Sequence, residues 1–151
     1  SAETTLRLAK DFENIVAIKE ASGNLDQIGR ILKYCPKDFL VISGDDSLTL
    51  PILALGGHGV ISVVGNALPA EFSTLVHSAM KGDLDTARFE HFKLLEFMSA
   101  IFAEGKPGGI KEALAVLGLC EKHLRLPLVN VGEATAKRIY QSMADAEVVK
   151  L

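Results

Sequence analysis

Lys19 is the side chain of this sequence best placed for covalent chemistry. It directly follows IVAI, residues 15 to 18, an unbroken apolar run that predicts a strand covered on both faces. At the end of a buried strand, poor hydration disfavours the ammonium form and leaves more free amine, which can attack a carbonyl carbon. The pattern suggests a lysine that forms a Schiff base. The alternative is an ordinary strand that ends in solvent or in an ion pair.

Two further apolar runs predict strands. FLVIS, residues 39 to 43, precedes the turn GDDS, and GVISVVGN covers residues 59 to 66. The aspartates of the turn, Asp45 and Asp46, either hold a divalent cation, act as acid and base, or cap the next helix. Ligands of parallel α/β proteins bind beyond the carboxyl ends of the strands, so these positions and Lys19 are where we expect a site.

Other motifs carry less information. Glu20 and Ser22 alternate behind Lys19 and are predicted to cap a turn. FAEGKPGGIK, residues 102 to 111, is a glycine-proline loop with two lysines, either a plain connection or an anion site at the start of the next helix. GGHGVISVVG does not predict a nucleotide site, because no Gly-Lys-Ser/Thr follows and its first glycines precede the strand.

The composition argues against several classes of function. The chain has 151 residues, 48% of them hydrophobic, and a formal net charge of -3, so it can build a core but has no basic stripe for nucleic acid. No apolar stretch approaches the roughly 20 residues of a membrane helix. A start at Ser1, inside a predicted helix and without a leader segment, predicts a cytoplasmic protein and an excised piece of a longer chain.

Metal and disulfide chemistry are not predicted. The four histidines share no metal-ligand spacing with one another or with the cysteines. Cys35 and Cys120 lie far apart in the sequence and are expected to be buried, reduced thiols. No cofactor is predicted.

Helices are predicted between and after the three apolar runs. Asp83 is expected to cap a long helix, and five apolar residues are assigned to its inner side. Those five residues are Ala87, Phe92, Leu95, Met98 and Phe102. The predicted helices run from Ala2 to Phe12, from a cap at Asn24 to Pro36, from a cap at Asp46 or Ser47 to Gly56, from Pro69 to Lys81, from Asp83 to Phe102, from Pro107 to Leu117 and from Glu133 to Ala146.

This order predicts parallel β-α units in residues 1 to 82 and a helical appendage in residues 83 to 151. Three parallel strands covered on both faces leave two edges of unpaired backbone groups. A closed barrel of such units needs eight strands and about 250 residues. The chain is therefore either a small open sheet or part of a larger barrel.

The motifs IVAIKEASGN, LVISGDDS and GGHGVISVVGNALP, in this order and spacing, resemble the second half of the dihydrodipicolinate synthase family, within the pyruvate-dependent aldolase superfamily. The resemblance covers essentially the whole chain. It implies an α/β fold, with a partial (β/α)8 TIM barrel in residues 1 to 82 that supplies strands six to eight. A C-terminal three-helix domain would occupy residues 83 to 151. Strands one to five would precede Ser1, and a homotetramer built from dimers is expected.

The same resemblance implies roles for three residues. Lys19 would form the Schiff base with pyruvate, the backbone at Ile61 would approach pyruvate, and Gly44 would line the mouth through which aspartate semialdehyde enters. The enamine would then attack the aldehyde and the product would cyclise, a step of lysine (diaminopimelate) biosynthesis. The tyrosines, threonine, arginine and GTTGE segment of the family's pocket belong to the missing first half. The loop of residues 102 to 111 departs from the commoner Asn-Pro-Ile-Pro version.

Two hypotheses of different classes remain open. The chain is either the C-terminal portion of a pyruvate-condensing synthase, inactive until joined to the N-terminal half, or a non-catalytic half-barrel that serves as an oligomerisation module. Within the enzyme hypothesis, an acetylneuraminate lyase or a sugar-acid aldolase of the same superfamily is the alternative.

Overall fold

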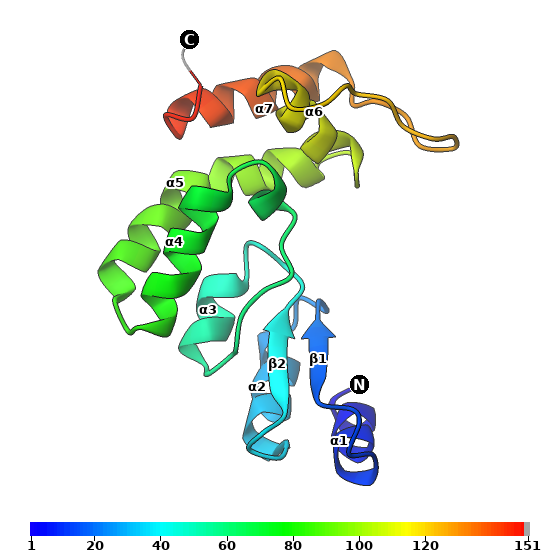
Figure 1. Cartoon of the computed structure of the whole chain (residues 1–151), viewed down its shortest axis with the longest axis vertical. Coiled ribbons are helices and arrows are strands. Elements are labelled where there is room, and N and C mark those ends of the chain that lie inside the picture. Colours follow the sequence, from blue (N-terminus) through cyan, green and yellow to red (C-terminus); the bar gives the residue numbers. More distant parts are fainter. Residues whose placement is uncertain (150–151) are drawn as a thin grey trace.

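The computed structural model describes residues 1 to 149. Figure 1 shows an elongated molecule in which the strands, α1 and α2 occupy one end and α6 and α7 the other. The elements are α1 (Ala2–Asp11), β1 (Ala17–Glu20), α2 (Leu25–Tyr34), β2 (Leu40–Ser43), α3 (Thr49–Ala54), the 3-10 helix η1 (Val64–Asn66), α4 (Pro69–Met80), α5 (Leu84–Phe102), α6 (Gly108–Val116) and α7 (Glu133–Asp145).

Three helices begin where the sequence provides a capping side chain. The side-chain oxygens of Ser1, Asn24 and Asp83 each accept a hydrogen bond from the backbone N–H three residues later. Each bond satisfies a donor that the helix itself cannot pair. These three predicted helix starts are confirmed.

The sheet consists of β1 and β2, which pair in parallel from Ala17 opposite Leu40 to Glu20 opposite Ser43. The connection between them contains α2, so the predicted β-α unit is confirmed. The IVAI run is poorly covered, since Val16, just before β1, is 60% exposed and Ala17 is also exposed, whereas Val41 of β2 is buried. The prediction that the IVAI run is covered on both faces is therefore wrong for this chain.

The prediction of a third strand over residues 59 to 66 is also wrong. Only Val60 forms a bridge, to Ser43, and the segment ends in η1. The backbone does follow β2 briefly, since the Ile61 N–H donates to the Ser43 carbonyl at 2.9 Å. The segment thus lies beside β2 for a few residues without becoming a strand.

Asp46 is the reason that this segment leaves the sheet. Its buried carboxylate accepts hydrogen bonds from the Ser62 hydroxyl and from the backbone N–H groups of Val63 and Val64, the latter two at 3.0 and 3.2 Å. These bonds turn the chain after Ile61. The prediction that Asp46 or Ser47 caps this helix is wrong, because α3 begins after Leu48 and has no side-chain cap.

Helices α4 to α7 enclose the larger of two cores. Its members extend from Val64 to Met143 and include Phe97 and Ile139, which expose none of their surface. A smaller cluster of Ile28, Ile31, Phe39, Val41 and Ile52 lies between α2, α3 and the strands. The larger core continues across residues 82 and 83, where α4 and α5 lie side by side (Figure 1). The division into two domains stays a prediction.

The inner face of α5 differs from its predicted face. Ala87 and Met98 are buried as expected, but Phe92 is 65% exposed and Leu95 is also exposed. Leu94, Phe97 and Ile101 point inward instead. Because α5 packs against both α4 and α7, these neighbours decide which of its many apolar residues are covered.

Both cysteines are free, as predicted, but Cys120 is exposed, and partial burial raises the pKa of the Cys35 thiol. Within residues 1 to 149, no helix combines the length and the apolar character needed to cross a membrane.

Candidate active site

The strand ends bring the predicted site residues to one edge of the sheet. Lys19 pairs with Ile42 in the ladder, one residue before each strand ends. Gly44 follows β2, and its N–H donates to the Glu20 carbonyl at 2.7 Å. Ile61 reaches the same edge through its hydrogen bond to the last residue of β2. The structure therefore brings Lys19, Gly44 and Ile61 to neighbouring positions.

Gly44 lies directly against the Lys19 side chain. A Cβ atom at Gly44 would stand 3.0 Å from Lys19 Cε, 3.1 Å from Lys19 Cγ and 2.7 Å from Ala21 Cβ. These distances are too short for any side chain to fit without movement of Lys19 or Ala21. Because Gly44 has no side chain, the side chain of Lys19 can lie directly beside it.

Lys19 itself is exposed, and no carboxylate of residues 1 to 149 forms a salt bridge with it. The poor hydration that the IVAI run predicts for its amine is therefore not provided by this chain. Of the two ordinary alternatives, an ion pair is not found among the described residues, and a strand that ends in solvent is what this chain shows. The Lys19 amine is available to a ligand or to another part of a larger protein.

Glu20, the next residue, is buried and has a structural role. Its Oε1 accepts from the Gln27 amide at 2.9 Å and its Oε2 from the Ser22 N–H at 3.3 Å. Ser22 in turn accepts from the Asn24 N–H at 3.1 Å. The predicted turn capping is confirmed for both residues. Successive strand residues point to opposite faces, so Glu20 points away from Lys19.

The loop after β2 is fixed by a buried network of hydroxyl groups. Ser43 Oγ donates to the Asp45 carbonyl at 2.8 Å, and Thr49 Oγ1 donates to the same carbonyl at 2.8 Å. Asp45 Oδ1 accepts from both the N–H and the hydroxyl of Ser47, so Asp45 caps the turn. Asp45 and Asp46 therefore use their carboxylates in separate hydrogen-bond groups.

No metal site emerges from the two aspartates. Within the described part of the chain, no three side chains of the types that ligate metals gather into a cluster that could hold an ion. The groups of this site that can do chemistry are an amine, hydroxyls and carboxylates.

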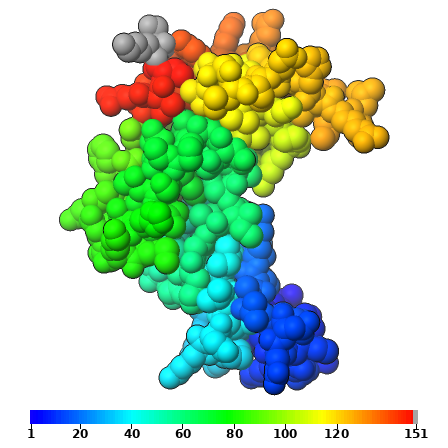
Figure 2. All heavy atoms as spheres, viewed as in Figure 1, coloured from blue at the N-terminus to red at the C-terminus, as the bar shows by residue number. Residues whose placement is uncertain are grey.

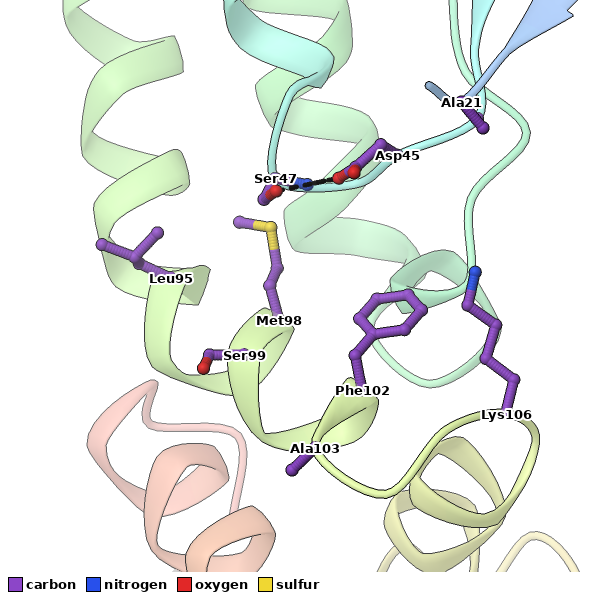
Figure 3. Close-up of a pocket in the computed structure, with 10 residues that line it drawn as sticks. Ala21, Asp45, Ser47, Leu95, Met98, Ser99, Phe102, Ala103 and Lys106 are labelled. Carbon is purple, nitrogen blue, oxygen red and sulfur yellow. Dashed lines mark hydrogen bonds between the residues drawn. The ribbon is translucent and has the colours of Figure 1, made fainter. Parts of the chain in front are cut away.

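A pocket of about 470 Å³ opens beside Gly44. Figure 2 shows the outline of the molecule hollowed between the strands, in blue and cyan, and the helices drawn in yellow. Figure 3 shows the pocket walls, which come from the strand-end loops on one side and from α5 and the loop after it on the other. The lining residues are Ala21, Gly44, Asp45, Ser47, Leu95, Met98, Ser99, Phe102, Ala103 and Lys106.

The loop that carries Lys106 is tied to α7. The Glu104 carboxylate accepts a hydrogen bond from the Thr135 side chain and from the Gly132 N–H, the latter at 3.1 Å. These two bonds, in that order of importance, hold the pKa of Glu104 below its usual value. Sequence reasoning did not place Lys106 in a site with Gly44, although the two lysines of this loop were a signal for anion binding.

Comparisons with known proteins agree on one family. A profile described as the dihydrodipicolinate synthetase family matches residues 1 to 146. The chain is 52% identical over 143 residues to the 4-hydroxy-tetrahydrodipicolinate synthase of Azobacteroides pseudotrichonymphae, which is 95% of this chain and 48% of that relative. The chain spans about half the length of the curated relatives that it matches.

Solved structures agree with the sequence relatives. The dihydrodipicolinate synthase of Aquifex aeolicus matches with a TM-score of 0.94 and 40% identity, over 100% of this chain and 52% of that chain. The chloride-inhibited dihydrodipicolinate synthase of Acinetobacter baumannii, complexed with pyruvate, matches with a TM-score of 0.93 and 30% identity, over 99% of this chain and 51% of that chain.

Proposed function

The chain belongs to the dihydrodipicolinate synthetase family, and from this premise we propose that it is the C-terminal portion of an enzyme that condenses pyruvate with aspartate semialdehyde through a Schiff base at Lys19. The proposal assigns residues 1 to 82 to the last three β-α units of a (β/α)8 barrel. It assigns residues 83 to 151, of which 150 and 151 lie outside the described residues, to a helical C-terminal domain. The reaction would serve lysine biosynthesis.

The observation that carries this proposal is the close contact between the Lys19 side chain and Gly44. An amine with no ion pair among residues 1 to 149 lies at the carboxyl end of a parallel strand, and the glycine beside it leaves space for its side chain. The carboxyl ends of the strands are where barrels of this type bind their substrates. That the Acinetobacter protein was solved with pyruvate supports the choice of ligand.

The proposed chemistry is carried by the lysine amine. The Lys19 nitrogen attacks the ketone carbon of pyruvate, a C–N bond forms, and the ketone oxygen leaves as water. Loss of a methyl proton gives an enamine, which attacks the aldehyde carbon of aspartate semialdehyde. The amino group of that substrate then attacks the imine carbon, which closes the ring, and the C–N bond to Lys19 breaks and releases the lysine amine. The Ile61 N–H already donates to Ser43, so we assign the approach to pyruvate to the Ile61 carbonyl. Gly44 would border the entrance for the aldehyde.

Lys19 is exposed in this chain, so we assign the burial of its amine to the part of the barrel that precedes residue 1. This assignment explains why the chain by itself is expected to be inactive. It also makes the N-terminal portion of the barrel a required partner, and we include the homotetramer in the proposal.

Trapping with borohydride tests the proposal. Pyruvate and borohydride are added to the intact protein that contains this chain and to the 151-residue chain, and the modified peptide is identified by mass spectrometry. We expect a stable adduct on Lys19 in the intact protein, no adduct in Lys19→Arg, and a normal adduct in the control Lys37→Arg. Absence of an adduct at Lys19 from both proteins would refute the Schiff-base assignment.

The alternatives have separate tests. The relatives above carry the synthase name, so an acetylneuraminate lyase or a sugar-acid aldolase is not favoured, and turnover of aspartate semialdehyde by the intact protein decides between them. A monodisperse dimer of the 151-residue chain alone would support the half-barrel module. Aggregation, or recovery only with an upstream portion, would support the enzyme.

A further inference from the structure

We propose that Asp46 is a positioning residue for the pyruvate site, which acts by fixing the backbone carbonyl of Ile61 through hydrogen bonds to residues 62 to 64. The contact between Ile61 and pyruvate rests on the proposed function, whereas the hydrogen bonds of Asp46 are features of this chain. Asp46 does not touch the substrate in this proposal. It acts from the interior, because only 2% of its surface is exposed.

The Ile61 carbonyl lies between two backbone groups whose positions are fixed. On one side, the Ile61 N–H donates to the Ser43 carbonyl at 2.9 Å, at the end of β2. On the other side, the Val63 N–H donates to Asp46 Oδ2 at 3.0 Å. Because peptide groups are planar, the orientation of the Ile61 carbonyl depends on the few backbone dihedral angles between these two hydrogen bonds. Loss of either bond would allow the carbonyl more orientations.

Ser62, the residue after Ile61, is held by its side chain as well. Its hydroxyl donates to Asp46 Oδ1 and accepts from the Gly65 N–H, the latter at 2.8 Å. Gly65 can approach this closely because it has no side chain, and a Cβ atom there would lie 3.3 Å from Ser62 Oγ. The Ser62 hydroxyl therefore links the Asp46 carboxylate to η1, directly beyond the carbonyl of Ile61.

Asp46 uses both of its carboxylate oxygens for this purpose. Oδ1 accepts from Ser62, and Oδ2 accepts from the N–H groups of Val63 and Val64, the latter at 3.2 Å. Hydrogen bonds to an ionised acceptor are stronger than those to a neutral one, and burial protects them from competition with water. An asparagine would offer only one acceptor oxygen in the same place. One buried carboxylate thus determines how the chain turns after Ile61.

The reactive lysine is positioned by other contacts. Lys19 belongs to the ladder between β1 and β2, and its side chain lies against Gly44. The hydrogen bonds of Asp46 go instead to residues 62 to 64. Their loss should therefore disturb the contact of pyruvate with Ile61 and leave the amine in place. This predicts weaker binding of pyruvate, with little change in the rate of adduct formation once pyruvate is saturating.

Borohydride trapping at a series of pyruvate concentrations tests the role of Asp46 in the intact protein. We expect Asp46→Asn to raise the half-saturating pyruvate concentration about tenfold and to change the rate at saturation by less than about twofold. Ser62→Ala removes one of the three hydrogen bonds to the carboxylate and should raise the half-saturating concentration about threefold. Ser62→Thr keeps the hydroxyl and should restore the value of the unmodified protein.

Ile31→Ala separates positioning from a general loss of stability. Ile31 belongs to the smaller core, so its truncation should destabilise the strand region at least as much as Asp46→Asn does, but it forms none of these hydrogen bonds. At a temperature where circular dichroism shows every variant folded, its half-saturating pyruvate concentration should be unchanged. An unchanged value in Asp46→Asn, or an equal increase in Ile31→Ala, would overturn the proposal. If Asp46→Asn does not fold, the two Ser62 variants provide the same test.

Pyruvate binding to Lys19→Met, which has no amine at this position, separates this proposal from the Schiff-base function. Saturation-transfer difference NMR measures this binding in the intact protein, and we expect it to weaken about tenfold when Asp46→Asn is added. An adduct at Lys19 in the unmodified protein, together with equal pyruvate affinity of the single and double variants, would leave the function standing and refute the role of Asp46. Weaker binding by the double variant, without any adduct in the unmodified protein, would give the opposite result.

Discussion

The strand region, residues 15 to 62, and the helical region, residues 64 to 149, are held together by different interactions. Around β1 and β2, buried polar side chains bind backbone groups and one another. These side chains are Glu20, Ser43, Asp46 and Thr49. Between α4 and α7, the buried residues are almost all apolar. Hydrogen bonds are directional and apolar burial is not, so the strand region fixes positions while the helical region supplies most of the stabilisation.

Exposure follows the same division. Ile61 at the strand edge is 55% exposed, whereas Phe97 in α5 is fully buried. Lys19, the residue proposed to react, therefore lies where the chain buries little apolar surface, and Gly44 beside it lines a pocket whose opposite wall comes from α5. Local opening should be easier in the strand region than in the helical region, because its core is smaller.

Matched truncations of the two cores give the largest effects. Leu94→Ala in the helical region should lower the free energy of unfolding by about 4 kcal/mol, and Ile31→Ala in the strand region by about 2 to 3 kcal/mol, since a cavity in a thinner region collapses more easily. Urea denaturation of both variants measures the difference. Equal losses, or a larger loss for Ile31→Ala, would contradict the proposed division of stability.

Adding one methyl group tests how closely α6 packs on α5. A Cβ atom at Gly109 would lie 2.2 Å from the Ile101 carbonyl oxygen, so Gly109→Ala should cost about 3 kcal/mol through displacement of backbone. The control is Gly29→Ala in α2, where nothing lies within 4 Å, and there the change should stabilise the protein by up to about 1 kcal/mol. Thermal unfolding of the two variants should shift in opposite directions.

The hydrogen bonds of Asp46 test the strand region itself. Asp46→Asn replaces one acceptor oxygen by an NH₂ group that faces a donor, and this should cost about 2 kcal/mol. Hydrogen exchange should accelerate at Val63 and Val64 and stay unchanged in α7. The exposed Asp26→Asn serves as control, with a change below about 0.5 kcal/mol. Uniform acceleration across the whole chain would argue against a local role.

The sequence predicted features that depend on near neighbours in the chain. The caps at Ser1, Asn24 and Asp83 depend on a donor three residues away, and all three are confirmed. The parallel pairing of β1 with β2 was also predictable, because two short apolar runs separated by a helix favour a β-α unit. The same runs placed Lys19 and Gly44 at the strand ends.

Features that depend on distant residues were not predictable. The run over residues 59 to 66 has the pattern of a strand, but the Asp46 carboxylate, far back in the sequence, turns it into a 3-10 helix. Phe92 has a helical spacing that suits the core, yet the packing of α4 and α7 leaves it exposed. The meeting of Lys106 with Gly44 at one pocket likewise depends on tertiary structure, which no local motif contains.

A methyl group at Gly44 should affect chemistry more than stability. In Gly44→Ala the new Cβ atom would push against Lys19 and Ala21, at an exposed edge that can adjust at a cost of about 1 kcal/mol. Displacement of the Lys19 amine should slow formation of the pyruvate adduct in the intact protein about tenfold. The rate of borohydride trapping measures this effect, with Gly29→Ala as the control. An unchanged rate would show that Gly44 does not position Lys19.

The smallest effect is expected at a polar contact on the surface of the helical region. Hydrogen bonds from Thr135 and Gly132 hold the pKa of Glu104 below its usual value of 4.5, so the folded state favours the carboxylate more than the unfolded state does. The resulting stabilisation is complete above the unfolded pKa and is lost as the pH falls through the lower, folded pKa. Urea midpoints of the unmodified protein and of Glu104→Gln should therefore differ at pH 7 and converge below pH of about 4.

Thr135→Val removes the main hydrogen-bond donor to Glu104. Its urea midpoint should also differ from that of the unmodified protein at pH 7, by less than for Glu104→Gln, and this difference should shrink in acid. Parallel curves for the unmodified protein and Glu104→Gln from neutral to acid pH would contradict this account. Because Glu104 is exposed, its loss should cost much less than the loss of the buried Asp46 carboxylate. The two acidic residues make similar hydrogen bonds to backbone N–H groups, so the difference between their effects isolates the contribution of burial.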